Sequence, residues 1–375
     1  GGTLAACTPT KRHLNAAAGM LPRCSGAPAS GAVGRLGPLS LAAGRGGTLA
    51  ACTGARQQST SAPISARWLG AEPTPPYTAA GKLRTGLRAI SAPWNDWVVE
   101  PPREETLAVR RAILNGPLAP SVSASDGSAS TLEAEAEVCV LLRAYMPSRF
   151  PNTPSLPLPS AGGRLSDAAR VVEEDLVLLR TDADGTATIV AATVLFSFGG
   201  VREKIGTPLA SIHAPVPHYA ESLERPVNRV INGLGVDKGY ARGNWELRRD
   251  GDLVHPSLHA PGSKGGLHAG REGLEPHPSE LWLHVEHQTL RRLPESAHVL
   301  FTVRTFCDPL PEIARAPEAA RALLARLKTA PVELLRYKGL SDEGELKKIC
   351  AYVELLGAGG GASGVGSSEL GQAAG

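Results

Sequence analysis

Two apolar segments joined by a tight turn constrain the fold most. Residues 175–179 read Asp-Leu-Val-Leu-Leu and residues 188–196 read Thr-Ile-Val-Ala-Ala-Thr-Val-Leu-Phe, a composition typical of β-strands. Between them, the segment from Asp182 to Gly185 is a turn of the Asp-Gly kind, which joins antiparallel strands. The second segment is apolar without alternation, so we expect it to lie in the middle of a sheet.

A helical stretch with one histidine at its start follows these strands. His213 lies in a turn that Pro215 and Pro217 make stiff and poorly helical. Apolar residues then recur at intervals of three and four, which predicts a buried helix that ends at Gly233 or Gly235. A histidine in this place suits an axial ligand to a flat cofactor between helix and sheet, while a histidine that only caps the helix start is the alternative. The apolar stripe comprises Val216, Tyr219, Leu223, Val227, Val230, Ile231 and Leu234.

Three more strands are predicted beyond this helix, at residues 245–249, 281–286 and 299–304. The last two alternate, with odd-numbered residues facing the core, and the segment from Arg291 to Ser296 falls within the connection of a predicted hairpin. Two strands, a helical stretch and three strands predict an α+β fold. We expect an antiparallel sheet with helices packed over one face, enclosing a pocket between the two layers.

Additional helices flank this unit on both sides. Residues 104–114 and 132–145 are predicted helices on the N-terminal side; the second ends before Pro147, and a loop at 121–130 separates them. On the C-terminal side, we expect a basic amphipathic helix over 318–328 and a helical end over 334–356, followed by a disordered Gly/Ser-rich tail at 357–375. The high counts of glycine, 42, and proline, 31, favour one ordered domain, over 94–356.

The N-terminal 71 residues differ in composition from the rest. They hold seven basic residues and no acidic one, and an Arg-, Ala- and Ser-rich segment of this kind is typical of an organellar transit peptide. The segment from Arg56 to Ser61 resembles a matrix-processing site, which favours the mitochondrion over the chloroplast. A disordered extension or a mistranslated upstream region is the alternative, given that residues 1–8 repeat at 46–53. Residues 72–93, rich in Pro and Gly, are predicted to be an irregular linker.

The charge and hydropathy of the sequence argue against a nucleic-acid-binding surface and against a transmembrane segment. Without the seven basic residues of the leader, 32 of the 39 basic residues remain against 36 acidic ones, which argues against a nucleic-acid-binding surface. No apolar stretch reaches the roughly 18 residues of a membrane span, so no transmembrane segment is predicted.

The cysteines and histidines offer few metal sites. None of the six cysteines forms a Cys-x-x-Cys pair, which removes zinc ribbons and iron–sulfur clusters from consideration. Cys139, Cys307 and Cys350 are predicted to be buried free thiols. Residues 256–279 form a Gly-, Pro- and His-rich insertion that we expect to be mobile. Its neighbourhood holds histidines without a fixed geometry, for which adventitious metal binding is the prediction: His255, His259, His268 and His277.

Five blocks of sequence resemble a known family, in the same order. The chain resembles the haem-dependent oxidative N-demethylase alpha-subunit-like family over about residues 94–356. The blocks run from Pro208 to Tyr219, Arg242 to Trp245, Glu286 to Pro294, Leu300 to Thr305 and Tyr337 to Leu340.

The resemblance implies a PAS-like haem-binding fold and an activity. The family's characterised enzyme removes a methyl group from a small secondary amine with dioxygen and releases formaldehyde. For this chain the resemblance implies a b-type haem whose iron has His213 as axial ligand, and Glu286 orienting a cationic amine. It also implies cofactor contacts from Arg242, Trp245, Arg291 and Arg292, with the arginines neutralising propionates. For Glu286, Arg291 and Arg292, structural ion pairs are the alternative.

Two further expectations follow from the resemblance. The family enzyme takes electrons from separate flavin and iron–sulfur subunits; this chain contains neither site, so a reductase partner is expected. His287 stands where the family usually has arginine, which is expected to change a propionate or substrate contact. Two alternatives remain: a non-catalytic PAS-like sensor of haem or a small ligand, and a structural subunit of an organellar assembly that has lost the cofactor.

Overall fold

A computed structural model describes residues 86–153, 158, 161–195, 200–249, 251, 277–340 and 342–359. The predicted transit peptide, most of the predicted linker and insertion, and nearly all of the predicted tail lie outside these residues. Where the described residues reach into the predicted linker, over 86–93, they include a strand at Arg88–Ser91, so that part of the linker is not irregular. Residues 357–359 likewise belong to a helix and not to a tail.

The described residues form one antiparallel sheet of seven strands in the order β1-β5-β6-β7-β3-β4-β2. The predicted order of two strands, helices and three strands is confirmed by β3, β4, β5, β6 and β7, as is the α+β class. Short strands β1 and β2 pair with the two outer members of this set. The bounds are β1 Arg88–Ser91, β2 Ser123–Ser125, β3 Asp175–Thr181, β4 Ala187–Thr193, β5 Lys238–Arg248, β6 Trp282–Arg292 and β7 Val299–Pro309.

Two of the predicted connections have different bounds in the structure. The hairpin of β6 and β7 is confirmed, but Arg291 and Arg292 belong to β6, and the turn closes between the Leu293 amide and the His298 carbonyl at 2.8 Å. The predicted loop at 121–130 contains β2, which pairs with β4. Strand β4 was expected in the middle of the sheet, but it lies next to the edge strand β2. It is nevertheless buried along its length.

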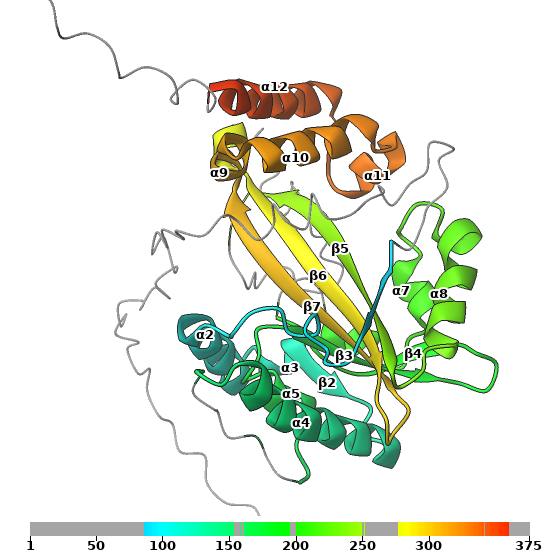
Figure 1. The fold of residues 1–375 in the computed structure, drawn as a ribbon. Coiled ribbons are helices and arrows are strands. Elements are labelled where there is room, and N and C mark those ends of the chain that lie inside the picture. The colour runs from blue at the N-terminus through cyan, green and yellow to red at the C-terminus, as the bar shows by residue number, and fades with distance from the viewer. Residues whose placement is uncertain are drawn as a thin grey trace, which may run out of the picture. The chain divides into compact units, whose positions relative to one another are not determined.

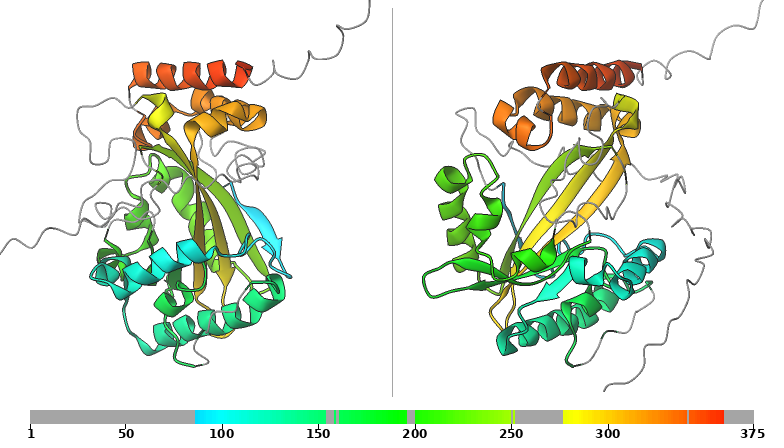
Figure 2. Two further views of the ribbon diagram at one scale, coloured as in Figure 1. Left: turned by 90° about the vertical axis from the view of Figure 1, so that its left-hand side faces the viewer. Right: turned by 180° about the vertical axis from the view of Figure 1, so that it is seen from behind.

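Helices cover both faces of the sheet, whereas we predicted helices over one face (Figures 1 and 2). The α4 face carries Leu176, Leu178 and Leu300, which share one core with the N-terminal helices. Those helices are α2 Glu104–Asn115, α3 Ala119–Val122, α4 Ala129–Arg149 and α5 Leu165–Ala168. Helix α4 continues past Pro147, which lies in its last turn and therefore removes only a terminal hydrogen bond.

The opposite, α8 face carries Val177, Tyr240, Leu290 and Phe301, which share a second core with the helical stretch between β4 and β5. This stretch is broken into shorter pieces than the single helix that we predicted, and it ends at Gly233 as expected. The pieces are α6 Val201–Lys204, α7 Leu209–His213, the π-helical turn η1 Tyr219–Leu223 and α8 Glu224–Asn232. Pro226, in the first turn of α8, is placed where a helix tolerates proline.

A third core lies at the far end of the long strands, where the C-terminal helices gather (Figure 1). Trp245, Leu247 and Leu283 pack there against Ile313 and Leu323. The predicted helix over 318–328 is confirmed, and the predicted helical end is divided in two. These helices are α9 Leu310–Arg315, α10 Pro317–Thr329, α11 Val332–Tyr337 and α12 Glu343–Gly359.

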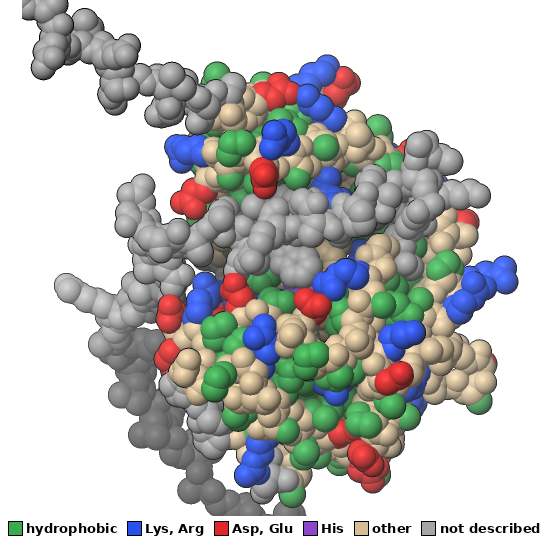
Figure 3. All heavy atoms as spheres, in the orientation of Figure 1, with side chains coloured by type: hydrophobic (Ala, Val, Ile, Leu, Met, Phe, Trp, Pro, Cys, Tyr) green, Lys and Arg blue, Asp and Glu red, His purple; other side chains and the backbone are tan. Residues whose placement is uncertain are grey.

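Two observations concern the charge of the surface and the length of the helices. On the side shown in Figure 3, basic and acidic side chains of the described residues are interspersed, without a large patch of one sign. Among the described helices, none has both the length and the apolar character that crossing a bilayer requires.

Candidate functional site

His213 is the last residue of the short helix α7, not part of a non-helical turn. Its Nδ1 lies 2.9 Å from the carbonyl oxygen of Leu209, one helical turn earlier. Its ring stacks on that of Tyr219, with centroids 4.8 Å apart and an interplanar angle of 11°. Two backbone irregularities adjoin this pair: His218 has a left-handed φ of 58°, and η1 begins at Tyr219. Such features cluster at functional sites.

These contacts fix the chemical state of the His213 ring. A carbonyl oxygen only accepts hydrogen bonds, so Nδ1 carries the proton and Nε2 carries the lone pair. Burial lowers the pKa of His213; the Leu209 hydrogen bond raises it, and the nearby charge of Arg242 lowers it further. The ring is therefore neutral at pH 7, which is the form that binds a metal.

Tyr219 is a site residue that sequence reasoning counted only as part of the apolar stripe. Its side chain is 5% exposed, and its hydroxyl is buried without a hydrogen-bond partner among the described residues. Burial, with a smaller contribution from Glu224, raises the pKa of Tyr219 to about 12, so the phenol stays protonated. A buried hydroxyl beside His213 can donate to a bound group.

The sheet opposite these helices carries a set of polar side chains on two adjacent strands. In the β5–β6 register, Arg242 pairs with Gln288 and Asn244 pairs with Glu286. Residues two apart share a face, and Leu290 assigns this set to the α8 face, the face that the His213 helices cover. Sequence reasoning found Arg242 and Glu286 but missed both amides.

Glu286 is held by these amides at one oxygen. Asn244 Nδ2 donates to Oε2 at 3.1 Å and Gln288 Nε2 donates to the same atom at 2.6 Å, and no described residue donates to Oε1. Burial raises the pKa of Glu286, and the charge of Glu246 raises it further, whereas the two amides and Lys338 lower it. A buried carboxylate of this kind favours a cationic partner.

Lys338 joins α11 to this set. It lies in the block from Tyr337 to Leu340 that resembles the family, and the sequence predicted no role for it. Its Nζ donates to Asn244 Oδ1 at 3.1 Å and to the Trp245 carbonyl at 2.5 Å, and it lies 5.0 Å from the centre of the Trp245 ring. Asn244 therefore connects Lys338 to Glu286 through its two amide atoms. No local pattern could reveal this contact, because 94 residues separate Lys338 from Asn244.

The structure does not bring three of the expected cofactor residues to His213. Trp245 pairs with Val285, on the face opposite Glu286, and packs in the third core with Leu247. Arg291 points to the α4 face, where its guanidinium lies 4.3 Å and 4.7 Å from the ring centres of Trp94 and Trp97.

Arg292 lies on the α8 face but binds the end of α8. It donates to the carbonyls of Leu234, Ile231 and Ala297 at 2.5, 2.7 and 2.5 Å. The contacts with Ile231 and Leu234 occupy carbonyls at the end of α8, and the contact with Ala297 lies within the β6–β7 turn. Arg291 and Arg292 therefore both have structural contacts with the protein, and they point to opposite faces because successive strand residues alternate.

His287, the departure from the family pattern, also lies away from the site. It faces the α4 side, is 1% exposed, and its Nε2 lies 2.7 Å from the Asp96 carbonyl. Burial lowers the pKa of His287, while Asp96 raises it. His287 therefore packs in the α4 face and does not lie on the face that carries Glu286.

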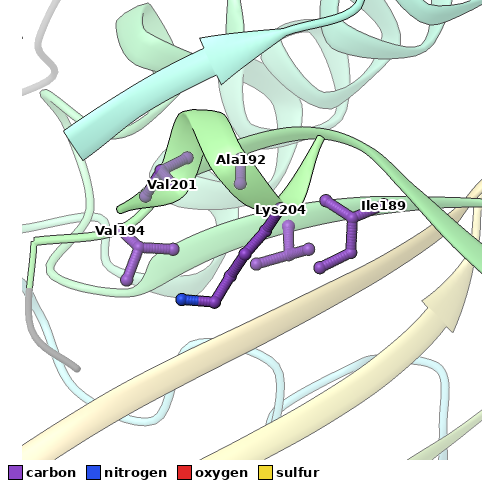
Figure 4. A pocket seen from close by; sticks show the side chains of 6 residues that line it. Ile189, Ala192, Val194, Val201 and Lys204 are labelled. Atoms are coloured by element: carbon purple, nitrogen blue, oxygen red, sulfur yellow. The ribbon is translucent and has the colours of Figure 1, made fainter. Parts of the chain in front are cut away.

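Two hollows among the described residues lie elsewhere. One lies under α6 and is apolar except for the amine of Lys204 (Figure 4); its lining is Val177, Ile189, Ala192, Val194, Val201 and Lys204. The other, between β2 and α5, is lined by Ser123, Ser125, Glu135 and Arg164 among others. Neither is lined by His213 or Glu286, so the site rests on contacts and chemistry. No group of three metal-binding side chains occurs within the described part of the chain, and three of the four insertion histidines lie outside it.

One comparison with known proteins bears on the site. The sequence profile of the family described as haem-dependent oxidative N-demethylase, alpha subunit-like, matches residues 155–346, just over half of the 375 residues. This range contains His213, Arg242, Glu286 and Lys338. No curated protein matches the chain. The length of the family match shows that the chain belongs to the haem-dependent oxidative N-demethylase, alpha subunit-like, family.

Proposed function

We propose that this chain binds haem b through His213 and takes part in oxidative removal of a methyl group from a small amine. Dioxygen is the oxidant, and a separate flavin or iron–sulfur reductase supplies electrons. The observation that carries the proposal is the His213 ring itself: Nδ1 is committed to the Leu209 carbonyl, which leaves Nε2 as a neutral metal ligand. The family membership supplies the identity of the cofactor.

The residues around His213 fit a haem. Nε2 would bind the iron, and the positive charge of Arg242 is close enough to act on His213 and would neutralise a propionate. The buried Tyr219 hydroxyl has no hydrogen-bond partner within the described part of the chain. A PAS-like arrangement is part of the proposal. It is supported by the antiparallel sheet and by the order of two strands, helices and three strands.

Each turnover removes one methyl group from the amine. When bound, haem supplies the activation of dioxygen. The amine with one N-methyl group, dioxygen, two electrons and two protons give the demethylated amine, formaldehyde and water. One oxygen atom enters the methyl carbon, whose C–N bond then breaks, and the other leaves as water. The chain itself must bind the amine, orient its methyl group and accept or hold protons.

Glu286 is suited to binding the amine. A small alkylamine is protonated at pH 7, because its pKa is close to that of lysine. Asn244 and Gln288 fix Oε2, so the carboxylate has one orientation and Oε1 is available for an ammonium N–H. We expect Glu286→Gln to raise the KM for the amine about tenfold or more, as loss of a buried charge-assisted hydrogen bond implies, with haem retained. An unchanged KM would remove Glu286 from the site.

The first test is the visible absorption spectrum of the full chain, with pyridine haemochrome quantification. Wild type is expected to hold about one haem per chain and to show a Soret band that His213→Ala loses or shifts. His287→Ala is the matched control, since it removes a buried histidine from the other face. A folded, colourless wild type produced with ample haem precursor would contradict haem binding and favour a structural subunit.

A second test separates the enzyme from a sensor of the same fold. Formaldehyde release from a methylated amine, dependent on added reductant and dioxygen, is expected for wild type and not for His213→Ala. Haem binding without turnover of any small methylated amine, with a competent electron donor present, would favour the sensor.

The basic leader completes the proposal with a location. We infer that residues 1–71 direct the chain to the mitochondrion, on the basis of their arginine content and lack of acidic residues. Uptake and cleavage by isolated mitochondria test this; uptake by chloroplasts alone would overturn it.

A further inference from the structure

A second row of reactive side chains lies beside the Glu286 row on the same face. In the sheet register, His284 of β6 pairs with Glu246 of β5 on one side and with Cys307 of β7 on the other. The next pairs of the same face join Glu286 to Asn244 and to Thr305. Residues two apart along a strand are about 7 Å apart, so the two rows are neighbours.

Cys307 and His284 are in direct contact. The Sγ of Cys307 lies 3.4 Å from the Nδ1 of His284, within hydrogen-bond reach for sulfur. His284 is 1% exposed, whereas Cys307 is half-buried and not fully buried as its sequence neighbours predicted. A thiol bonded to an imidazole is the pair of groups that activates a cysteine nucleophile. Glu246, the register neighbour of His284 on the other side, has its carboxylate bound by Arg248.

The two other described cysteines have no such partner. The Sγ of Cys139 donates to the Arg164 carbonyl, and burial raises the pKa of Cys139 to about 12. Cys350 is half-buried like Cys307, but burial raises the pKa of its thiol and no imidazole contacts it among the described residues. Cys307 thus differs from Cys350 by the contact with His284 and not by the extent of exposure.

We propose that Cys307 is a nucleophilic thiol, activated by His284, that captures a small aldehyde on the α8 face. His284 takes the thiol proton, the sulfur forms a bond to the carbonyl carbon, and the carbonyl π bond breaks. The proton then returns to the oxygen, which gives a sulfur-bound hydroxymethyl group when the aldehyde is formaldehyde. No atom or electron is lost, and the addition is reversible. Glu246, which neighbours His284 in the register and is ion-paired with Arg248, contributes its negative charge near the imidazole.

The choice of aldehyde rests on the proposed function, because oxidative demethylation releases formaldehyde beside Glu286, one row away. Formaldehyde is a small, strong electrophile, and a thiolate is the most nucleophilic group that the described part of this face offers. Transient capture would hold the product until a second acceptor takes it, so a reaction that consumes one-carbon units at the aldehyde level is expected to follow.

The first experiment measures thiol alkylation in the full chain without reductant. Iodoacetamide labelling is followed by mass spectrometry of peptides over a range of pH, with Cys350 as the internal control. At pH 7 we expect Cys307 to react about tenfold faster than Cys350 or more, since each unit of pKa difference is tenfold in thiolate fraction near neutral pH. Equal or slower labelling of Cys307 would overturn the proposal.

Two variants test the roles of His284 and Glu246. His284→Gln is expected to remove the advantage of Cys307 at pH 7, and Glu246→Gln to reduce it and shift its pH profile upwards. Because His284 is fully buried, His284→Gln could fail to fold. Glu246→Gln and the wild-type pH profile then decide, since Glu246 is more exposed. A pH profile of Cys307 unchanged in Glu246→Gln would remove Glu246 from the site.

The second experiment adds formaldehyde directly, so it does not depend on haem or turnover. Formaldehyde is expected to protect Cys307 from iodoacetamide at concentrations that leave Cys350 labelled, and protection should disappear when formaldehyde is removed. Fast alkylation without protection would overturn the aldehyde as the ligand. If formaldehyde protects Cys307 in a chain that cannot bind haem, the aldehyde site at Cys307 stands, but demethylation by this chain is rejected as the source of the formaldehyde.

Discussion

His287 and Glu286 are neighbours in β6, yet their side chains lie on opposite faces of the sheet in different surroundings. On the α4 face, His287 binds a backbone carbonyl and Arg291 lies between two indole rings. On the α8 face, Glu286 is held by two amides at a single oxygen and faces the helices that carry His213. Both faces are buried and polar in part, so burial alone does not distinguish structure from function.

The buried cations make the difference clearer. Beside α2, Arg110 binds the carboxylate of Asp175 and three carbonyls, and Arg304 pairs with Glu173. These groups hold elements together that are far apart in sequence. On the α8 face, the polar side chains lie in rows along the strands, and the Tyr219 hydroxyl is buried without a partner among the described residues. The second pattern is what a ligand would complete.

Arg110→Ala should give the largest effect on the structural side. The change leaves Asp175 as a buried charge and three carbonyls without a donor, so we expect a loss of about 3–5 kcal/mol in the free energy of unfolding. Urea denaturation measures it. Arg111→Ala is the control in the same helix; its ion pair with the exposed Glu104 should be worth at most about 1 kcal/mol. Similar losses for both variants would contradict the assignment.

Glu174→Gln should reverse a pH-dependent loss of stability on the same side. Burial raises the pKa of Glu174 to about 7, with Glu173 adding to the shift and Arg304 and Arg110 opposing it. In the unfolded chain the pKa is near 4.3, so between these values the folded state binds more protons. Stability is then lost as pH rises from about 4 through 7.

The glutamine stays neutral, so Glu174→Gln should gain roughly 2 kcal/mol over wild type between pH 5 and pH 8. Unfolding at several pH values measures this difference, which also cancels the contribution of the buried histidines. Glu333→Gln, at an exposed helix start, is the control and should show no such gain. A constant difference from pH 5 to pH 8 would mean that Glu174 is already ionised when folded.

Comparing a histidine variant on each face should separate haem binding from the stability of the folded chain. His287→Ala loses a buried hydrogen bond to Asp96 and is expected to cost roughly 1–3 kcal/mol without loss of haem. His213→Ala is expected to lose haem at a cost of about 1 kcal/mol or less in the haem-free chain. Denaturation of haem-free protein and haem titration measure the two effects. Loss of haem in His287→Ala with His213→Ala unaffected would invert the assignment of the faces.

Sequence periodicity predicted the parts of the fold that local patterns determine. The strand pairs, the Asp-Gly turn and the end of α8 at Gly233 follow from apolar spacing and turn residues. Strands β1 and β2 were missed because they are short and hold residues such as Ser and Ala. Their place is set by backbone pairing with β5 and β4, not by their own composition.

The site was predicted only in part, because its residues meet through the sheet register. Arg242 and Glu286 lie on the α8 face, and His213 belongs to a helix that packs on it. Arg291 and Arg292 were assigned to the connection because the predicted strand ended at 286, whereas β6 continues to Arg292. This error hid the alternation that sends the two arginines to opposite faces. Lys338 and Asn244 meet across 94 residues, and the contact of His284 with Cys307 depends on the hairpin register. No spacing within the sequence encodes such pairs.

Arg291→Lys should give the smallest effect and the sharpest test of the two faces. The flat guanidinium lies over both Trp94 and Trp97, and a lysine ammonium keeps the charge but cannot stack on two rings. We expect a loss of about 1 kcal/mol in unfolding free energy with haem content unchanged. Arg242→Lys is the matched variant on the α8 face, where weaker pairing with the proposed propionate should reduce haem retention instead. If Arg291→Lys loses haem while Arg242→Lys does not, Arg291 is the propionate ligand and its stacking on the two indoles serves to position it.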